Sequence, residues 1–381
     1  MWSIIEYKVN TRMGNEQYQS GKIKLIFSKG QVEKSGEILR KSSGDTDWAI
    51  EVIRNYRAAH LYPLMIIKNL VWKHARKVTP DATIARRLKR LPTIIHKLQR
   101  ATLDGNSTNS INLKRMQDIG GCRVIVNNKK ELIELNRSLS ESRTIHETVR
   151  TKDYIESPKQ TGYRGIHRIY KCYSKKESHD WKGFFIEVQL RTKLQHLWAT
   201  TVEVVDLCEK QTIKTNPVAT SKGWSEFFFI MSEFLAEEDG FIHLSNIQKA
   251  IYKETLNKLD TSLNAYNKLA SFNAVFSNKD ISIKAFNNGY ALLIIDGIKG
   301  RVAIELYSKD DEKTAIERYG QEENDPNNNA LLVGIDDVKS LKTAYPNYLV
   351  DTRKFTERLR KYINSVYWIQ NRGPRTQKDL V

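Results

Sequence analysis

The sequence of 381 residues is poor in cysteine and has no long run of apolar residues. Its three cysteines, Cys122, Cys172 and Cys208, lie far apart, and none belongs to a CxxC pair. This spacing indicates neither a disulfide framework nor a zinc site, so we expect core thiols of a reduced, cytoplasmic protein. No segment has the apolar length that a signal peptide or a membrane-spanning helix needs, and we therefore expect no membrane partner.

Acidic residues are too few to balance the basic ones. The chain has 62 Lys and Arg against 44 Asp and Glu, a formal net charge of +18 and a pI near 9.6. Excess positive charge favours a polyanionic partner such as RNA, although a basic surface also serves solubility. The candidate RNA footprint is a group of five cations: Arg86, Arg90, Arg100, Lys114 and Arg115.

One segment, Phe184 to Arg191, alternates apolar and polar residues as a half-buried strand does. One face would carry Phe184, Ile186, Val188 and Leu190, and the other Glu187, Gln189 and Arg191. A carboxylate, an amide and a guanidinium on an open face suit Mg²⁺ and phosphate oxygens. A solvated amphipathic edge strand would show the same pattern.

A second acidic residue, Asp118, comes just before a short apolar strand expected from Arg123 to Val126. The intervening Gly120 and Gly121 would let a ligand approach the backbone closely. Asp118 is therefore the natural second carboxylate of the site.

Cations and one aromatic ring lie on either side of Asp118 in the chain. In the turn-rich loop before His167, Tyr163 can stack on a base while Lys159 and Arg164 contact phosphates. Upstream, a cation cluster precedes a helix expected to begin at Pro92: Arg86, Arg87, Lys89 and Arg90, with Lys97 about one turn into the helix. Such a cluster suits a triphosphate, but it also suits a solvated surface.

Taken in order, these pieces resemble the RelA/SpoT synthetase domain, which transfers pyrophosphate from ATP to a nucleotide hydroxyl. Four blocks carry the resemblance: R-x-K-x-x-x-[ST]-I-x-x-K from Arg87 to Lys97, D-I-x-G-x-R from Asp118 to Arg123, K-D-Y-I from Lys152 with P-K-x-x-G-Y-R-x-[IL]-H from Pro158 to His167, and E-[IV]-Q-[IL]-R-T from Glu187 to Thr192. Their order and spacing agree, and the resemblance covers roughly residues 25 to 240.

The resemblance implies a role for each matching residue. Asp118 and Glu187 would hold Mg²⁺, and Glu187 would also help to deprotonate the attacking hydroxyl. The ATP site would use Arg87 and Arg123 on the adenine and Lys89 and Lys97 on the phosphates. The acceptor site would use Lys159, Tyr163, Arg164, His167, Gln189 and Arg191. For His167, a buried structural histidine is the open alternative. No zinc is implied.

The expected fold class is α/β, a nucleotidyltransferase-like mixed sheet with flanking helices. We predict a helix from Asp47 to about Arg76 that Pro63 breaks. The other elements expected are strands at Arg123–Val126, Arg168–Cys172 and Phe184–Leu190, and helices near Lys130–Ser138, Lys193–Leu207, Trp224–Ala236 and Ser245–Ala270. The predicted domains are an N-terminal extension (1–24), a pyrophosphotransferase domain (25–240), a helical linker (241–270), a C-terminal regulatory domain (271–365) and a basic tail (366–381).

The C-terminal domain is expected to be a small α+β unit. Strands at Ile281–Phe286, Tyr290–Asp296 and Arg301–Tyr307 would be joined by turns at Asn287–Gly289 and Gly297–Gly300. A helix at Lys309–Tyr319, a strand at Ala330–Ile335 and two short helices would follow. This part has no His after His243 and no Cys after Cys208, so it cannot supply a Cys/His metal site of its own.

A Y-x-x-Y turn formed by Tyr345 and Tyr348 is the most distinctive feature of that domain. With it, the chain resembles the CapRel group of fused toxin–antitoxin synthetases, whose pseudo-zinc-finger domain folds back over the ATP site. The resemblance implies that a phage protein binds this domain and releases the block in abortive infection. The alternative is that both tyrosines pack under the last helix.

Three hypotheses remain at this point. The leading one is an autoinhibited toxin that transfers pyrophosphate from ATP to the 3′ CCA end of tRNA. The second is a regulated synthetase of (p)ppGpp or a related alarmone, with GDP or GTP as the acceptor. The third is a catalytically silent RNA-binding or infection-sensing module.

Overall fold

The protein is described as a computed structural model covering residues 22–89, 91–99, 111–208, 222–270, 287–296, 301–324, 328–337 and 352–364. The chain divides into two compact units. The first comprises Met1–Ser157 and Arg164–Lys193, and the second comprises Pro158–Tyr163 and Leu194–Val381.

The first unit opens with three helices: α2 (Lys29–Lys41), α3 (Thr46–Ala59) and α4 (Leu61–Val78). A capping box of Ser28 and Gln31 starts α2, and the side chain of Asp45 caps α3. The expected interruption of the long helix exists, but it falls at His60 rather than at Pro63. Pro63 lies in the first turn of α4, where a residue without an N–H is tolerated because that N–H would have no helical acceptor.

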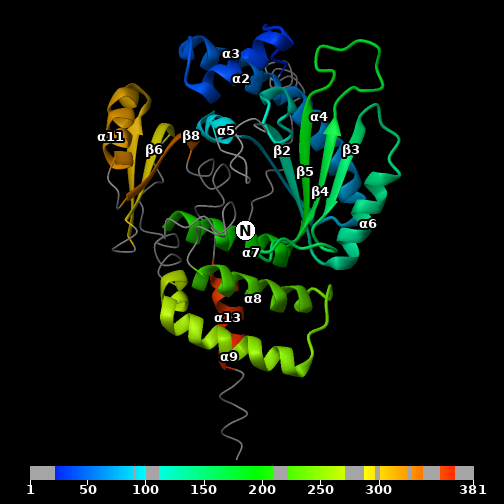
Figure 1. The fold of residues 1–381 in the computed structure, drawn as a ribbon, viewed down its shortest axis with the longest axis vertical. Coiled ribbons are helices and arrows are strands. Elements are labelled where there is room, and N and C mark those ends of the chain that lie inside the picture. Colours follow the sequence, from blue (N-terminus) through cyan, green and yellow to red (C-terminus); the bar gives the residue numbers. More distant parts are fainter. Residues whose placement is uncertain are drawn as a thin grey trace, which may run out of the picture. The chain divides into compact units, whose positions relative to one another are not determined.

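A five-stranded mixed sheet forms the centre of the first unit, in the order β1-β2-β5-β4-β3. Its strands are β1 (Thr83–Leu88), β2 (Gly120–Val126), β3 (Glu147–Asp153), β4 (Ile166–Lys171) and β5 (Phe185–Thr192). β2 and β5 are parallel, whereas the other neighbours are antiparallel. The remaining elements are α5 (Leu91–Gln99), a 3₁₀ turn η2 (Leu113–Arg115) and α6 (Lys129–Ser140). The α/β prediction of a mixed sheet with flanking helices is confirmed (Figure 1).

Helices α4 and α6 pack on one face of this sheet. The buried residues there come from alternate strand positions: Cys122, Val124, Val126, Ile186, Val188 and Leu190. Leu64, Ile67, Leu132 and Leu135 of the two helices are also buried. The opposite face of β5 carries Glu187 and Gln189, which are only partly buried, so the alternation expected for β5 is confirmed.

Two strands were not expected from the sequence, β1 and β3, and both are edge strands of the sheet. β3 has the sequence ETVRTKD and is exposed along almost its whole length. In β1, Arg86 interrupts the apolar positions Ile84 and Leu88, and β3 has a single apolar residue, Val149. Neither strand therefore shows the alternation by which a half-buried strand is recognised.

The second unit contains α7 (Lys193–Cys208) from Leu194 onward, together with α8 (Lys222–Glu238), α9 (Asn246–Leu263) and α13 (Arg353–Asn364). The helix expected to Ala270 is interrupted at Asn264, whose φ of 52° is left-handed, and residues 265–270 are helical again.

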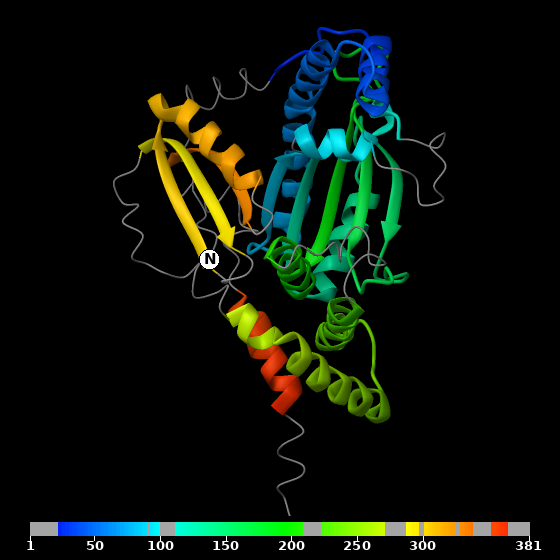
Figure 2. The same ribbon diagram turned by 60° about the vertical axis from the view of Figure 1, so that its left-hand side comes forward.

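Helix α13 packs on α8 and α9, as both ribbon views show (Figure 1, Figure 2). Phe355 lies against Phe227 and Phe228, and the ring of Tyr362 stacks on that of Phe234 with centroids 4.5 Å apart. This helix falls within the predicted C-terminal domain (271–365), and its packing on α8 and α9 has no local signal in the sequence.

A three-stranded antiparallel sheet with the order β7-β6-β8 follows α9 in the chain. Its elements are β6 (Asn287–Asp296), β7 (Arg301–Ser308), η4 (Lys309–Asp311), α11 (Glu312–Asn324) and β8 (Asn328–Asp337). This agrees with the predicted α+β character, but the turn expected at Asn287–Gly289 is wrong. These residues belong to the central strand, where Gly289 pairs with both Ser308 and Ile335. Ladder pairing on two sides outweighs the local turn preference of Asn and Gly.

The segment Ile281–Phe286 lies outside the described residues. Across the helices that the structure describes, none combines the length and the apolar character needed to cross a membrane.

Candidate active site

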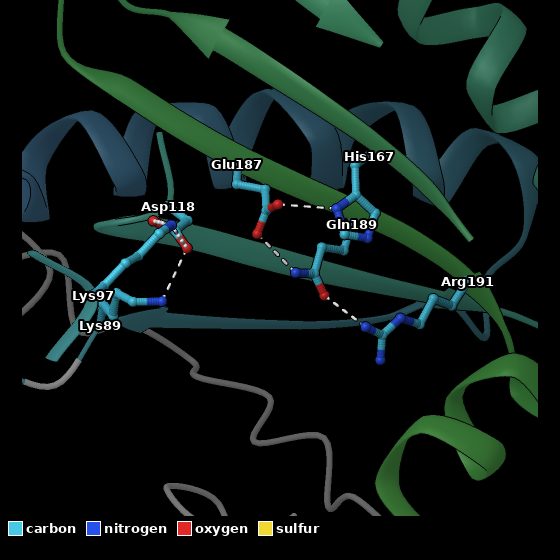
Figure 3. A network of polar contacts seen from close by, with 7 residues as sticks. All are labelled: Lys89, Lys97, Asp118, His167, Glu187, Gln189 and Arg191. Atoms are coloured by element: carbon cyan, nitrogen blue, oxygen red, sulfur yellow. Dashed lines mark hydrogen bonds and ion pairs between the residues drawn. The ribbon is translucent and has the colours of Figure 1, made fainter. Parts of the chain in front are cut away.

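Glu187 lies at the centre of a chain of polar contacts on β5 (Figure 3). Its Oε1 accepts a hydrogen bond from His167 Nδ1 at 2.9 Å, and its Oε2 accepts one from Gln189 Nε2 at 2.7 Å. Arg191 Nη2 in turn donates to Gln189 Oε1 at 2.9 Å. Strand register explains the geometry, because His167 on β4 is directly opposite Gln189 on β5.

These contacts hold Glu187 in its ionised form. Burial alone would raise its pKa, but the hydrogen bonds from His167 and Gln189 and the charges of His167 and Arg191 lower the pKa to about 2. An ionised carboxylate is what a cation binds. The ionised form suits the predicted cation-binding role of Glu187. Its predicted help in deprotonating the acceptor hydroxyl stays a prediction.

Asp118 lies between η2 and β2 and is held by two lysines (Figure 3). Lys89 Nζ is 2.9 Å from Asp118 Oδ2, and Lys97 Nζ is 2.9 Å from Oδ1 and 2.8 Å from Oδ2. Burial would raise the pKa of Asp118, but the two ammonium charges outweigh it and lower the pKa. The lysines predicted to bind phosphate therefore contact the predicted metal ligand in this structure.

The backbones that carry the two lysines are anchored. Lys89 N donates to Ile119 O at 2.7 Å, and Arg57 Nε donates to Lys89 O at 2.7 Å. Lys97 lies on α5, which buries Ile94 and Leu98 completely. The stems of Lys89 and Lys97 thus start from fixed points, and only their flexible ends can change partner.

Gly120 and Gly121 bring β2 close to β5. A Cβ on Gly120 would lie 2.8 Å from Ile186 Cδ1, and one on Gly121 would lie 3.2 Å from Glu187 O. At Gly120, Ile186 of β5 takes the room that was expected for a ligand. At Gly121, which pairs with Glu187, that expectation stays a prediction. The effect of the two glycines is to place Asp118 near Glu187, since Gly121 pairs with Glu187 in the parallel ladder.

Asp118 and Glu187 fit a magnesium ion as a partial ligand set. Mg²⁺ is commonly held by one or two carboxylates, with water and substrate phosphates supplying the other oxygens. Two carboxylates leave most of the coordination positions of Mg²⁺ to water and substrate phosphates.

The residues predicted to hold adenine lie on neighbouring strands. Arg123 on β2 is opposite Ala85 of β1 and Gln189 of β5. The backbone of Arg87 on β1 pairs with Gly121. Their roles toward ATP stay predictions.

In the second unit, a tight turn carries the predicted stacking ring, Tyr163. Gly162 has a φ of +87°, and a Cβ there would lie 2.7 Å from Ser232 Cβ, so this position requires glycine. Lys159 Nζ lies 5.1 Å from the centroid of the Tyr163 ring, whose other neighbours include Trp198. Tyr163 is only 4% exposed, and its stacking on an acceptor base stays a prediction.

The other predicted acceptor residues, Arg164, His167, Gln189 and Arg191, belong to the first unit. His167 and Gln189 contact Glu187 as described above. Arg191 is 1% exposed and does not share the open face expected for it, because its guanidinium is buried where it bonds to Gln189.

Tyr154 was not assigned a role from the sequence, although it lies in the K-D-Y-I block. Its ring meets that of His167 edge to face with centroids 5.1 Å apart. Burial and the charge of Glu187 raise the pKa of Tyr154. It therefore packs the side of His167 and helps to fix the imidazole that orients Glu187.

Two residues of the predicted RNA footprint, Arg86 and Lys114, have different surroundings in the structure. Arg86 is opposite Cys122 in the ladder, on the face that α4 covers, and its charge contributes to lowering the pKa of Lys68 on α4. Lys114 forms an ion pair with Glu33 at 2.9 Å. Arg86 is exposed, and the role of this group of cations toward RNA stays a prediction. Arg90, Arg100, Tyr345 and Tyr348 lie outside the described residues.

Comparison with known proteins places this site within a recognised segment. Residues 86–205 match a family model described as "Region found in RelA / SpoT proteins". The chain carries a RelA/SpoT region. Lys89, Lys97, Asp118 and Glu187 all lie within the RelA/SpoT region, which covers less than half of the chain.

A curated relative is the GTP pyrophosphokinase YjbM of Bacillus subtilis (strain 168), 26% identical over 122 residues. The match covers 32% of this chain and 54% of that protein, so the chain spans about half the length of this relative.

Two solved structures show a partial likeness. Small alarmone synthetase 1 of Bacillus subtilis, bound to its product pppGpp, has a TM-score of 0.40 and 19% identity, over 51% of this chain and 94% of that one. A GTP pyrophosphokinase family protein of Streptococcus pneumoniae has a TM-score of 0.34 and 20% identity, over 47% and 85%.

Proposed function

We propose that the protein is an ATP-dependent pyrophosphotransferase. The observation that carries this proposal is the pair of ionised carboxylates, Asp118 and Glu187, beside two lysines within the RelA/SpoT region. In the proposed reaction, an acceptor hydroxyl oxygen attacks the β-phosphorus of ATP, and the bond between that phosphorus and the α,β-bridging oxygen breaks. AMP leaves, and the hydroxyl proton passes to solvent.

The residues contribute positioning and charge rather than covalent chemistry. Asp118 and Glu187 would hold Mg²⁺, which when bound neutralises charge on the phosphates. Lys89 and Lys97 bring two further positive charges to the same place. His167, Gln189 and Tyr154 fix the orientation of Glu187.

For the acceptor, we propose the 3′ CCA end of tRNA. The formal charge of +18 supports a polyanionic substrate. GDP or GTP is the second candidate, and the name of the Bacillus relative, a GTP pyrophosphokinase, supports it. We further propose that the C-terminal region restrains the enzyme and that a phage protein relieves the restraint.

The test measures the transfer of a radioactive label from ATP to the acceptor. The β- and γ-phosphates move together, so γ-labelled ATP should label tRNA if RNA is the acceptor and GDP or GTP if a nucleotide is. Asp118→Asn and Glu187→Gln should each abolish transfer, because each removes a charge that holds the cation. Lys258→Met, which breaks an exposed ion pair with Glu254 on α9, is the matched control and should keep activity. Substantial transfer by either carboxylate variant would contradict the site.

A further inference from the structure

The two lysines on Asp118 occupy the atoms that a metal ion would use. Lys97 reaches both carboxylate oxygens, and Lys89 reaches Oδ2, all within 2.9 Å. Glu187 differs, because its hydrogen bonds come from Gln189 Nε2 and His167 Nδ1 and not from a lysine, although the charges of His167 and Arg191 act on it as well. A divalent cation at Asp118 must therefore compete with ammonium groups for the same lone pairs, whereas at Glu187 it meets no lysine within the described network.

The charge balance around Asp118 opposes a cation that arrives alone. One carboxylate faces two ammonium groups, and all three side chains are largely buried, with exposed fractions of 24%, 19% and 31% for Asp118, Lys89 and Lys97. Repulsion between like charges is strong in such a partly desolvated place. A triphosphate reverses the balance, because its several negative charges attract both the lysines and the metal ion.

We infer that Lys89 and Lys97 make cation binding at Asp118 conditional on nucleotide, an inference that rests on the proposed function. Without nucleotide, the lysines stay on Asp118 and the site binds a divalent cation weakly. When a triphosphate binds, the lysine ends transfer to phosphate oxygens and Asp118 becomes available to the metal. The anchored backbones of Lys89 and α5 permit this exchange with movement of side chains alone. Metal and nucleotide then bind with positive coupling.

The test measures Mn²⁺ binding to the full chain in the absence of nucleotide, from the electron paramagnetic resonance signal of free Mn²⁺. Lys97→Met removes one competing charge and should raise the affinity for Mn²⁺ by roughly tenfold or more. Lys97→Arg keeps the charge and should leave the affinity close to that of the wild type. Lys258→Met is the matched control, since it removes a lysine from an ion pair with Glu254 on α9, in the second unit.

A second measurement tests whether nucleotide binding and Mn²⁺ binding are coupled. With a non-hydrolysable ATP analogue present, Mn²⁺ affinity should rise steeply in the wild type and much less in Lys97→Met. Lys89→Met provides an independent variant, and circular dichroism establishes that each variant is folded. Adding Asp118→Asn to Lys97→Met should cancel the gain in Mn²⁺ affinity.

The outcomes separate this inference from the proposed function. Equal Mn²⁺ affinity in the wild type, Lys97→Met and Lys89→Met would overturn the inference. A gain that survives Asp118→Asn would overturn it too, because the metal would then bind elsewhere. Failure of the wild type to transfer label to any acceptor would contradict the proposed function without altering the Mn²⁺ result.

Discussion

At the scale of single residues, the two carboxylates of the site are stabilised by different means. Asp118 is balanced by full positive charges, whereas Glu187 is stabilised mainly by directed hydrogen bonds from His167 and Gln189. This difference divides the roles, because a carboxylate held by movable ammonium groups can change partners and one held by strand neighbours keeps its place.

The low pKa of Glu187 predicts how stability changes with pH. The pKa is about 2 in the folded protein against an ordinary value of 4.5. A group whose pKa is depressed by folding stabilises the fold above its unfolded pKa, and this contribution is lost as pH falls through the folded pKa. We expect the wild type to lose up to about 3 kcal/mol more than Glu187→Gln between pH of about 5 and about 2. Urea unfolding at several pH values measures this, and parallel curves for the two proteins would contradict it.

At the scale of elements, the parallel pairing of β2 and β5 brings the site together. Gly120→Ala would place a methyl group 2.8 Å from Ile186 Cδ1, in a part of the core where Ile186 is fully buried. We expect this variant to be destabilised by about 1–3 kcal/mol, as overpacked cores are. Gly30→Ala is the control: its Cβ meets only Ser28 Oγ at 3.9 Å, and an alanine suits α2. Denaturant midpoints compare the two, and an equal effect would show that Gly120 is not tightly packed.

The sequence predicts the central elements of the site better than the peripheral ones. β5 is recognised by its alternation and the helices by their apolar periodicity, because those patterns arise from burial on one face. β1 and β3 were missed because Arg86 interrupts the apolar positions of β1 and because β3 is polar and exposed along almost its whole length. The lysine contacts of Asp118 and the burial of Arg191 and Tyr163 depend on which segments meet in space, and no local pattern encodes that.

At the scale of the whole molecule, regulation by the C-terminal region makes a separate prediction. If Tyr345 and Tyr348 block the ATP site, replacing both with Ala should cause growth arrest without any trigger. Adding Asp118→Asn should cure the arrest, because toxicity then requires the same catalytic carboxylate. Growth assays of the single, double and triple variants measure this, and wild-type growth of the double tyrosine variant would make these tyrosines ordinary packing residues.

The docking of α13 on α8 and α9 decides how the C-terminal region can be removed. Thr352 Oγ1 donates to Leu269 O at 2.9 Å although the two residues are 83 positions apart. The intervening chain is therefore an insertion whose two ends meet, and a short linker could close that gap at a small entropic cost. Cutting the chain at about Ser271 would also remove Phe355 and Tyr362 and expose the aromatic core of α8. In that truncated protein, an effect of lost regulation could not be separated from an effect of lost folding. Removing only the inserted segment keeps α13 in place, so that a change in activity then reports on regulation.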